Sequence, residues 1–414
     1  MENNVEKMER TISSFQYHIY TTMYCSLACQ HCFIDSDVRA DPTHMTVEQF
    51  KRVVDIYAEH FAQSDADKAE VTIIGGEPAT VKASFYLEVM PYLKEKFEAT
   101  GKFYYSSIVT NFLHTKNLAK FDHHFDSIVT SYEPLRFTDF NAKNNNGKKG
   151  NMWLRNVQQW IADGKKVSVS LTTTKDVVEG GTEMLDWLVE MGIDNFQFNA
   201  SVPEGDFLKG MISEEEYSEH LNVRKEELLE PVRNRKIFTI HEEKENSVFA
   251  TFDEESDYMI EMTKWYIKKR QEGHDINVYP IESYVAGLAD KVVIDDIACC
   301  VNKGLNTRVD GKTTGCASEI GSKEMLSYGN IYEEDLENIV DSDVRNAYVR
   351  ATKRVKRECV RCEFFKNCSG ACMLRAKLWD TSDPNAECHG LKRYLSYLEQ
   401  NIELIQEVSK NVCA

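Results

Sequence analysis

The sequence predicts an α/β protein: a partial (β/α)6 TIM-like barrel followed by a loop-rich C-terminal domain that is dense in cysteine. Two observations support this prediction. Strand-like and helix-like segments alternate through the first half of the chain, and nine of the twelve cysteines lie in its last third. Strands that alternate with helices form a parallel sheet with helices outside it. Six such units are fewer than the eight of a closed barrel, so we expect an open, partial one.

The expected strands are short, rich in β-branched or aromatic residues, and mostly followed by turn signals. They cover residues 17–23, 71–74, 104–110, 127–131, 166–172 and 196–200. The expected helices show apolar residues at helical spacing, and the first has Thr46 as its candidate N-cap. In the first half they cover residues 46–61, 82–99, 151–162, 182–191 and 213–229, and further along 257–270, 334–353 and 391–408.

Length and charge limit the functional classes. A chain of 414 residues favours two or three modules. The net charge of -18 argues against broad binding to nucleic acid or to an anionic membrane. No apolar run is long enough to span a bilayer, and the polar N-terminus does not resemble a secretory signal. We therefore expect a cytoplasmic protein with no nucleic-acid or membrane partner.

The cysteines divide the chain into modules. Without signs of secretion, clustered cysteines indicate metal binding or catalysis more than a disulfide scaffold. Three lie near the start, and a long cysteine-free stretch separates them from the others. We expect an N-terminal tail, the barrel, a bridging region, a cysteine-rich domain and a C-terminal helix with tail, at residues 1–15, 16–230, 231–298, 299–395 and 396–414.

The first cysteine group has the spacing C-x3-C-x2-C, formed by Cys25, Cys29 and Cys32 directly after the first expected strand. Sites in α/β sheets and barrels form at that end of a strand. Three thiolates on a short loop can hold three irons of a cubane cluster and leave the fourth iron open to a small ligand. The alternatives are three buried thiols or a zinc site completed by His31, which is poorly placed between two of the cysteines.

This spacing resembles the signature of the radical S-adenosylmethionine (SAM) superfamily. The resemblance implies a 4Fe-4S cluster on Cys25, Cys29 and Cys32, whose open iron binds the amino and carboxylate groups of SAM. It also implies that one electron from the reduced cluster cleaves SAM to methionine and a 5′-deoxyadenosyl radical, which abstracts hydrogen from a substrate. From the family we expect a flavodoxin or ferredoxin as electron donor.

A second motif, Gly75, Gly76, Glu77 and Pro78, follows the second expected strand. Paired glycines let the backbone approach a ligand closely, and a carboxylate can accept a bond from an ammonium group. In the resembled family this GGEP segment binds the amino group of SAM. The alternative is an ordinary turn.

Further SAM contacts are suggested by the resemblance at three positions. Phe33 matches the aromatic residue near the adenine, with a core aromatic as the alternative. Asn111 and Ser131 end the third and fourth expected strands and match family contacts, although turn capping suits both equally well. The downstream arginine of the family has only two candidates here, Arg136 and Arg155.

The second cysteine set follows a longer pattern. Cys300 and Cys316 stand with Gly311 between them, and a C-x2-C-x5-C-x3-C run and one further cysteine follow. This resembles the seven-cysteine pattern of SPASM domains, which extend many radical SAM enzymes. The segment at 329–331 also resembles the stretch between the two halves of that domain. The predicted C-terminal domain is thus a loop-rich, cluster-binding SPASM domain.

The resemblance implies two auxiliary 4Fe-4S clusters. The ligands of one are Cys359, Cys362, Cys368 and Cys388, and those of the other include Cys300, Cys316 and Cys372. The fourth ligand of the latter is either Cys299 or absent, leaving an open iron. A pair of zinc sites is the alternative, because C-x2-C spacing suits zinc equally well. Cys413, near the chain end, is expected to be a free thiol.

The substrate is less well indicated. SPASM enzymes mostly modify peptides or proteins, and others act on small molecules. Sulfatase-maturing relatives carry an Asp base where this chain has Ala317, which disfavours formylglycine formation; the next carboxylate, Glu319, is expected on the surface. The first strand begins too early to leave room for a separate leader-binding domain.

Three hypotheses follow. The first is modification of a ribosomally made peptide or a protein side chain by crosslinking, epimerisation or oxidation. The second is dehydrogenation, epimerisation or rearrangement of a small molecule. The third is a non-enzymatic or zinc-binding protein on this scaffold.

Overall fold

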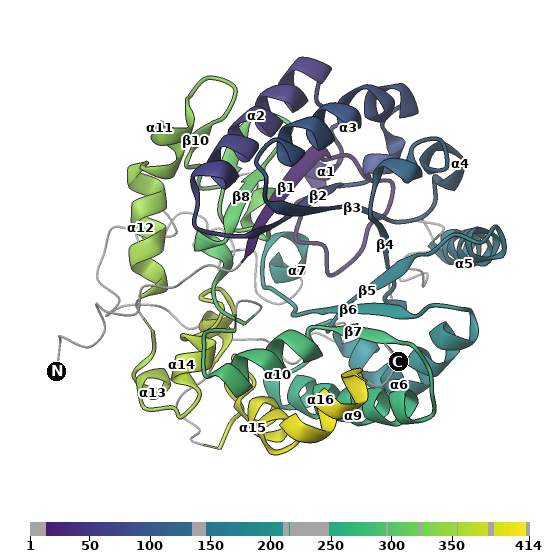
Figure 1. Cartoon of the computed structure of the whole chain (residues 1–414), viewed down its shortest axis with the longest axis vertical. Coiled ribbons are helices and arrows are strands. Elements are labelled where there is room, and N and C mark those ends of the chain that lie inside the picture. Colours follow the sequence, from purple (N-terminus) through teal and green to yellow (C-terminus); the bar gives the residue numbers. More distant parts are fainter. Residues whose placement is uncertain are drawn as a thin grey trace.

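A ten-stranded sheet organises the molecule, in the strand order β10-β9-β8-β1-β2-β3-β4-β5-β6-β7 (Figure 1). The computed structural model describes residues 14–134, 146–209, 215, 248–294, 297–322, 325–353, 355–379 and 385–410. Strands β1 to β7 pair in parallel in chain order, and β8 pairs in parallel with the other side of β1. Strands β9 and β10 extend this edge as an antiparallel addition.

All six predicted strands are present, which confirms the predicted α/β class with an open, partial barrel. Four short strands were not predicted: β7, which follows β6, and β8 to β10, which lie in the cysteine-rich region. In chain order the strands are β1 Ser14–Thr22, β2 Lys68–Gly75, β3 Phe103–Thr110, β4 Ser127–Ser131, β5 Ser168–Thr172, β6 Asn195–Asn199, β7 Asn277–Tyr279, β8 Gly304–Thr307, β9 Lys312–Thr314 and β10 Gly329–Asn330.

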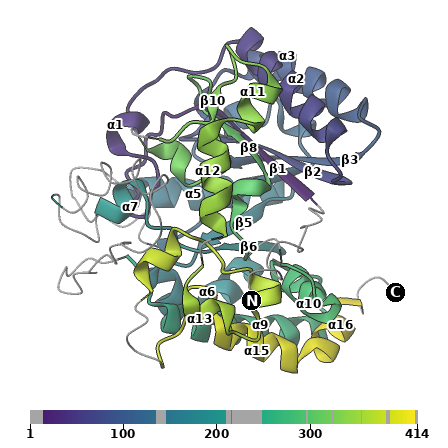
Figure 2. The same ribbon diagram turned by 90° about the vertical axis from the view of Figure 1, so that its left-hand side faces the viewer.

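Helices lie around the sheet (Figures 1 and 2). Those of the barrel are α1 Ser36–Arg39, α2 Val47–Gln63, α3 Ala83–Glu98, α4 Thr115–Leu118, α5 Asn146–Ala162, α6 Lys175–Glu190 and α7 Gly205–Lys209. Those that follow are α9 Phe252–Gln271, α10 Ile281–Asp290, α11 Leu336–Val340, α12 Asp343–Thr352, α13 Arg357–Val360, α14 Phe365–Cys368, α15 Lys392–Gln400 and α16 Ile402–Lys410. Within the described residues, no helix is both long and apolar enough to cross a membrane.

Helix α2 shows how the sequence pattern builds the barrel layer. The Thr46 hydroxyl accepts a hydrogen bond from the Gln49 backbone N–H, and the Gln49 side chain accepts one from the Thr46 backbone N–H. This reciprocal capping box fixes the predicted start of the helix. The apolar residues that recur along it are buried, including Phe50, Tyr57 and Phe61, and the helix packs against α3 and β1.

Three predicted helices differ in detail. Helix α6 consists of two helical segments joined across a kink at Gly181, and the helix predicted over 182–191 corresponds to the second of them. The helix predicted over 334–353 is two helices, because Ser342 caps a new start by accepting from the Arg345 N–H. The helix predicted over 391–408 is broken at Asn401 into α15 and α16. The helix predicted over 213–229 lies outside the described residues.

The C-terminal helices pack against the bridging region. Helices α15 and α16 contact α9 and α10 at the lower end of the molecule (Figure 1). The Arg270 guanidinium donates to the backbone carbonyls of Val408 and Ser409, at 3.2 and 2.8 Å. The described part of the C-terminal segment is therefore docked rather than trailing, while the predicted free thiol Cys413 lies outside the described residues.

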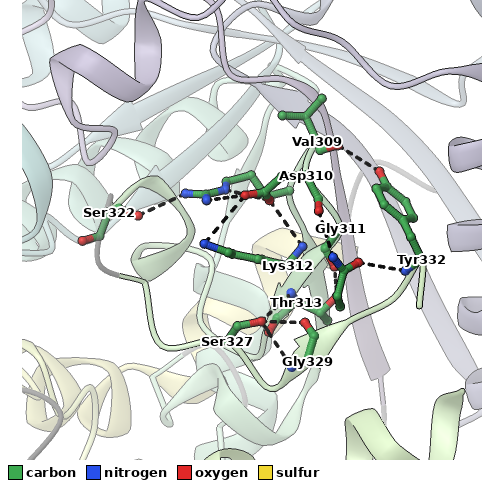
Figure 3. Close-up of polar contacts among 11 residues, drawn as sticks. Val309, Asp310, Gly311, Lys312, Thr313, Ser322, Ser327, Gly329 and Tyr332 are labelled. Atoms are coloured by element: carbon green, nitrogen blue, oxygen red, sulfur yellow. Dashed lines mark hydrogen bonds and ion pairs between the residues drawn. The ribbon is translucent and has the colours of Figure 1, made fainter. Parts of the chain in front are cut away.

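A turn between β8 and β9 carries the glycine of the second cysteine pattern. Gly311 has a φ of +85°, and a side chain there would overlap Asn330 and Tyr332. Its carbonyl accepts from the Ile331 backbone N–H, and the Tyr332 hydroxyl donates to the Val309 carbonyl (Figure 3). Glycine is therefore required at position 311 for both conformational and steric reasons. Gly311 allows the turn between β8 and β9 to close and β10 to pack against that hairpin.

Candidate functional site

The first cysteine group lies on the loop that leaves β1, at the carboxyl end of the parallel strands. Cys25, Cys29 and Cys32 are each partly buried, and none forms a disulfide. Backbone hydrogen bonds fix the loop: Cys25 N–H donates to the Arg39 carbonyl of α1, and the Cys32 carbonyl accepts from the Phe207 N–H of α7. The structure therefore places the three predicted cysteines on one anchored loop.

Polar groups surround these thiols. The Asn111 side-chain amide donates to the Cys25 Sγ at 3.7 Å, and the Leu27 backbone N–H donates to the same sulfur at 3.4 Å. The Arg39 guanidinium interacts electrostatically with Cys32 and Cys29. Donors and a cation beside sulfur favour the thiolate, which is the form that binds metal.

The GGEP segment packs directly against the start of the cysteine loop. Gly76 N–H donates to the Thr22 carbonyl at 3.0 Å, and Glu77 N–H donates to the Tyr24 carbonyl at 2.7 Å. A side chain at Gly75 would overlap the Thr22 carbonyl, and one at Gly76 would overlap the Tyr24 carbonyl. Both glycines are thus required by close backbone approach, and the two predicted motifs form one continuous surface.

The Glu77 side chain forms a buried set of hydrogen bonds next to the cysteine loop. Its carboxylate is fully buried and accepts from the Ala79 N–H, the Thr110 hydroxyl and the Asn111 N–H, at 2.9, 2.6 and 2.6 Å. These bonds join the end of β2 to the end of β3. Glu77 is therefore a positioning residue that holds Asn111 beside Cys25.

The remaining predicted contacts are placed unevenly. Phe33 is partly buried against a small apolar cluster that includes Tyr20 and Met23, and Gly205 and Gly321 lie close against its carbonyl group. Ser131 is partly exposed at the end of β4, facing the same end of the sheet. Of the two candidate arginines, Arg155 is exposed on α5. The other, residue 136, lies outside the described residues.

One buried carboxylate near this loop was not predicted. Glu133 is fully buried, accepts from the Thr172 N–H at 3.1 Å, and lies 3.4 Å from the His31 imidazole. His31 therefore has a carboxylate partner, rather than serving only as a spare ligand within the cysteine motif. The only local signal was a glutamate two residues beyond the β4 terminus, which does not reveal burial.

The second cysteine set divides into two groups. In the first group the Cys316 thiol hydrogen-bonds to Cys300 and lowers the pKa of the Cys300 thiol to about 7. Cys299 and Cys372 interact electrostatically, and both line a cavity of about 170 Å³ together with Cys300. Three separate chain segments therefore bring together the three predicted ligands and the additional candidate, Cys299.

The other four predicted cysteines form the second group. Cys359 interacts electrostatically with Cys388 and Cys362, and Cys368 with Cys359 and Cys362. Burial raises the pKa of the Cys359 and Cys368 thiols to about 11 and that of Cys388 to about 12. Gly390 leaves room beside Cys368 and Cys388, because a Cβ there would lie 3.4 and 3.8 Å from their sulfurs.

The donor chemistry fits iron–sulfur ligation. Within the described part of the chain, no three His, Cys, Asp or Glu side chains form a group suited to a single metal ion. The three groups consist of thiols without disulfides, the donors preferred by iron–sulfur clusters and also by zinc. Binding a metal or cluster requires these thiols to lose their protons, which links occupancy of the buried groups to stability.

The residues after Cys316 correct one prediction. Glu319 was expected on the surface, yet it is buried and accepts a hydrogen bond from the Tyr348 hydroxyl. The preceding Ala317 carbonyl accepts from the Tyr20 hydroxyl at 3.1 Å. Packing of α12 against this loop covers the glutamate, and a short sequence window carries no signal of that packing.

The comparisons with known proteins concern the fold. No family model matches the chain, and no curated protein matches it in sequence. A structure of polyhistidine-tagged anSMEcpe with bound AdoMet, which is SAM, is similar with a TM-score of 0.67 at 12% identity, over 96% of this chain and 95% of that chain.

Two peptide-bound structures are also similar. Native anSMEcpe with bound AdoMet and Kp18Cys peptide gives a TM-score of 0.67 at 12% identity, over 96% of this chain and 99% of that chain. Streptococcus suis SuiB bound to precursor peptide SuiA gives 0.55 at 17% identity, over 88% and 73%. The chain therefore has the fold of these AdoMet-bound and peptide-bound structures, which confirms the fold that the resemblance predicted.

Proposed function

We propose that this chain is a radical SAM enzyme with a SPASM-type C-terminal domain, and that it modifies a peptide or a protein side chain. One observation carries the proposal. The loop that carries the three cysteines after β1 is bonded at its start to the GGEP segment after β2, at the carboxyl end of a parallel sheet whose fold is shared with AdoMet-bound structures. Ligand sites of open α/β sheets lie at that end.

The SAM-binding cluster would be held by Cys25, Cys29 and Cys32. When bound and reduced, it supplies the electron that splits SAM into methionine and a 5′-deoxyadenosyl radical for hydrogen abstraction. Residues of the chain would position SAM. Gly76 allows the GGEP backbone to contact the start of the cysteine loop, and the Glu77 carboxylate holds the Asn111 backbone N–H.

Two auxiliary clusters would occupy the thiol groups of the C-terminal domain. Their ligands would be Cys359, Cys362, Cys368 and Cys388 in one case, and Cys299, Cys300, Cys316 and Cys372 in the other. Cys299 is preferred to an open iron, because its thiol lines the same cavity as Cys300 and Cys372.

A peptide substrate is supported by two similar structures. Native anSMEcpe is described with a bound peptide, and SuiB with a precursor peptide. Ala317 lacks the carboxylate that serves as base in sulfatase-maturing relatives, so we favour crosslinking, epimerisation or another oxidation over formylglycine formation. A flavodoxin or ferredoxin would supply the electron.

The test is stimulation of 5′-deoxyadenosine formation. Anaerobically reconstituted protein is incubated with SAM, a reductant, and either the high-mass or the low-mass fraction of a lysate from the source cells. Stimulation by the high-mass fraction alone, with a mass change in one peptide or protein, is expected. Stimulation by the low-mass fraction alone would replace the proposal with a small-molecule substrate.

A further inference from the structure

The cavity of about 170 Å³ lies where the barrel meets the cysteine-rich domain. Its barrel side includes Thr173 and Phe198, at the carboxyl ends of β5 and β6, and residues of α9. Its other side includes the thiols of Cys299, Cys300 and Cys372. A group held by these thiols would therefore be exposed to whatever charges line the opposite wall.

A buried ion pair lies on that wall. Glu255 of α9 and Arg375 of the C-terminal domain both line the cavity, and their side chains are only 3% and 6% exposed. The Arg375 guanidinium donates to the Glu255 carboxylate, whose other oxygen accepts from the Thr173 hydroxyl at 2.6 Å. Burying such a pair is costly, and apolar replacements are often no less stable. A contribution to folding stability is therefore a weak explanation for the presence of this buried ion pair.

The Arg375 side chain retains one buried donor without a partner among the described residues. Its guanidinium lies 4.9 Å from the centre of the Phe252 ring, which holds its plane. Within the described residues its Nε has no hydrogen-bond partner. Arg375 lies three residues after Cys372 and lines the same cavity, and the Ala376 backbone N–H donates to the Cys372 carbonyl at 3.0 Å.

Other charges on the wall are few. His389 also lines the cavity, and its Nε2 lies 2.9 Å from the Gly370 carbonyl oxygen. Among the described lining residues, Glu255 and Arg375 supply a carboxylate and a guanidinium, while Lys303 and Glu319 interact electrostatically with Cys300 from outside the lining. The Glu255–Arg375 pair thus places a guanidinium cation on the cavity wall, and the adjacent carboxylate reduces the electrostatic potential that this cation produces.

We propose that the Glu255–Arg375 pair sets the reduction potential of the auxiliary cluster bound by Cys299, Cys300, Cys316 and Cys372. Reduction adds one electron from an external low-potential donor, breaks no bond, and makes the cluster and its thiolates more negative by one charge. Arg375 stabilises that reduced form through its charge and its free Nε–H, while Glu255 limits the effect. This inference rests on the proposed function.

Opposite substitutions give opposite expectations. Arg375→Gln leaves the Glu255 carboxylate uncompensated, so the cluster becomes harder to reduce. Glu255→Gln leaves the guanidinium uncompensated, so it becomes easier to reduce. For each variant we expect about a tenfold change in the ratio of reduced to oxidised cluster at fixed potential, or about 59 mV for one electron. The double variant, which buries no unpaired charge, should fall between the two.

A matched control is available in the same domain. Arg308 is also buried and paired with a carboxylate, that of Asp310, and it donates to the Ser322 carbonyl at 3.1 Å. Asp310 lies in the β8–β9 turn (Figure 3), and Arg308 does not line the cavity. Arg308→Gln should leave the potential unchanged, since it removes the ion pair of a buried arginine without touching the cavity wall.

The measurement is a redox titration followed by electron paramagnetic resonance, with iron and sulfide counted for each variant. Cys29→Ala serves as the background, because it removes the signal of the SAM-binding cluster. Opposite shifts for Arg375→Gln and Glu255→Gln support the inference. The inference is overturned if both variants shift the reduction potential in the same direction. It is also overturned if both keep full iron content and the parent potential. If Arg375→Gln loses its iron, the test rests on the potentials of Glu255→Gln and of the double variant. A higher potential in Glu255→Gln than in the double variant supports the inference, and equal potentials overturn it.

The same measurements distinguish failure of this inference from failure of the proposed function. Parent protein without iron at these cysteines would overturn the proposed function, and with it the inference. Parent protein that has full iron and cleaves SAM, with variants of unchanged potential, would overturn the inference alone.

Discussion

Gly76 offers a direct test of the contact between the two N-terminal motifs. A Cβ at this position would lie 2.1 Å from the Met23 carbonyl oxygen, whereas real Cβ contacts essentially never fall below 3.0 Å. In Gly76→Ala the GGEP segment and the cysteine loop must therefore separate by about 0.9 Å. Forced overpacking of this kind costs about 1–3 kcal/mol. If that cost falls on the SAM-bound geometry, affinity for SAM should fall by roughly 5- to 150-fold.

The assay is anaerobic equilibrium dialysis of reconstituted protein against labelled SAM, with iron content and melting temperature measured in parallel. Gly180→Ala is the matched control, because a Cβ there meets the Met184 side chain no closer than 3.5 Å. The control should bind SAM normally. Gly76→Ala protein with full iron, a folded core and unchanged SAM affinity would refute the reasoning.

Two further predictions concern buried groups. Glu77→Gln should lower the melting temperature, because hydrogen bonds to a charged group contribute about 1.5–3 kcal/mol each. Glu88→Gln is the control, because the Glu88 side chain is exposed on α3. Equal melting temperatures of Glu77→Gln and the parent protein would contradict the positioning role assigned to Glu77. Cys368→Ala should lower iron content by about one cluster and leave the signal of the SAM-binding cluster intact. Unchanged iron would contradict the ligand assignment.

The sequence was sufficient for the barrel because each of its strands is a local pattern. Short runs rich in β-branched and aromatic residues placed β1 to β6, and apolar periodicity with Thr46 as candidate cap placed helix α2. Strands β8 to β10 were missed because they are only two to four residues long, and β8 also depends on a partner distant in the chain, since its Asn306 pairs with His18 of β1. The break before α12 depends on a capping hydroxyl at Ser342 inside an otherwise continuous helical pattern.

The candidate site was predictable where spacing encodes chemistry. Cysteine intervals indicated which thiols belong together, and within each of the two C-terminal sets several of the thiols interact in the structure. Residues that act through tertiary packing had no such signal. Glu255 and Arg375 are separated by 120 positions, and each by itself is an ordinary surface residue type. Glu319 and Glu133 were likewise hidden, because burial of a carboxylate depends on elements that pack over it.

The central claim is that Cys25, Cys29 and Cys32 bind the cluster that cleaves SAM. The most direct measurement is the yield of 5′-deoxyadenosine and methionine from anaerobically reconstituted protein with SAM and dithionite, compared between the parent chain and Cys29→Ala. We expect both products from the parent chain and neither from the variant, while the auxiliary clusters retain their iron. Equal product yields from the two proteins, or no product from parent protein with full iron content, would contradict the account.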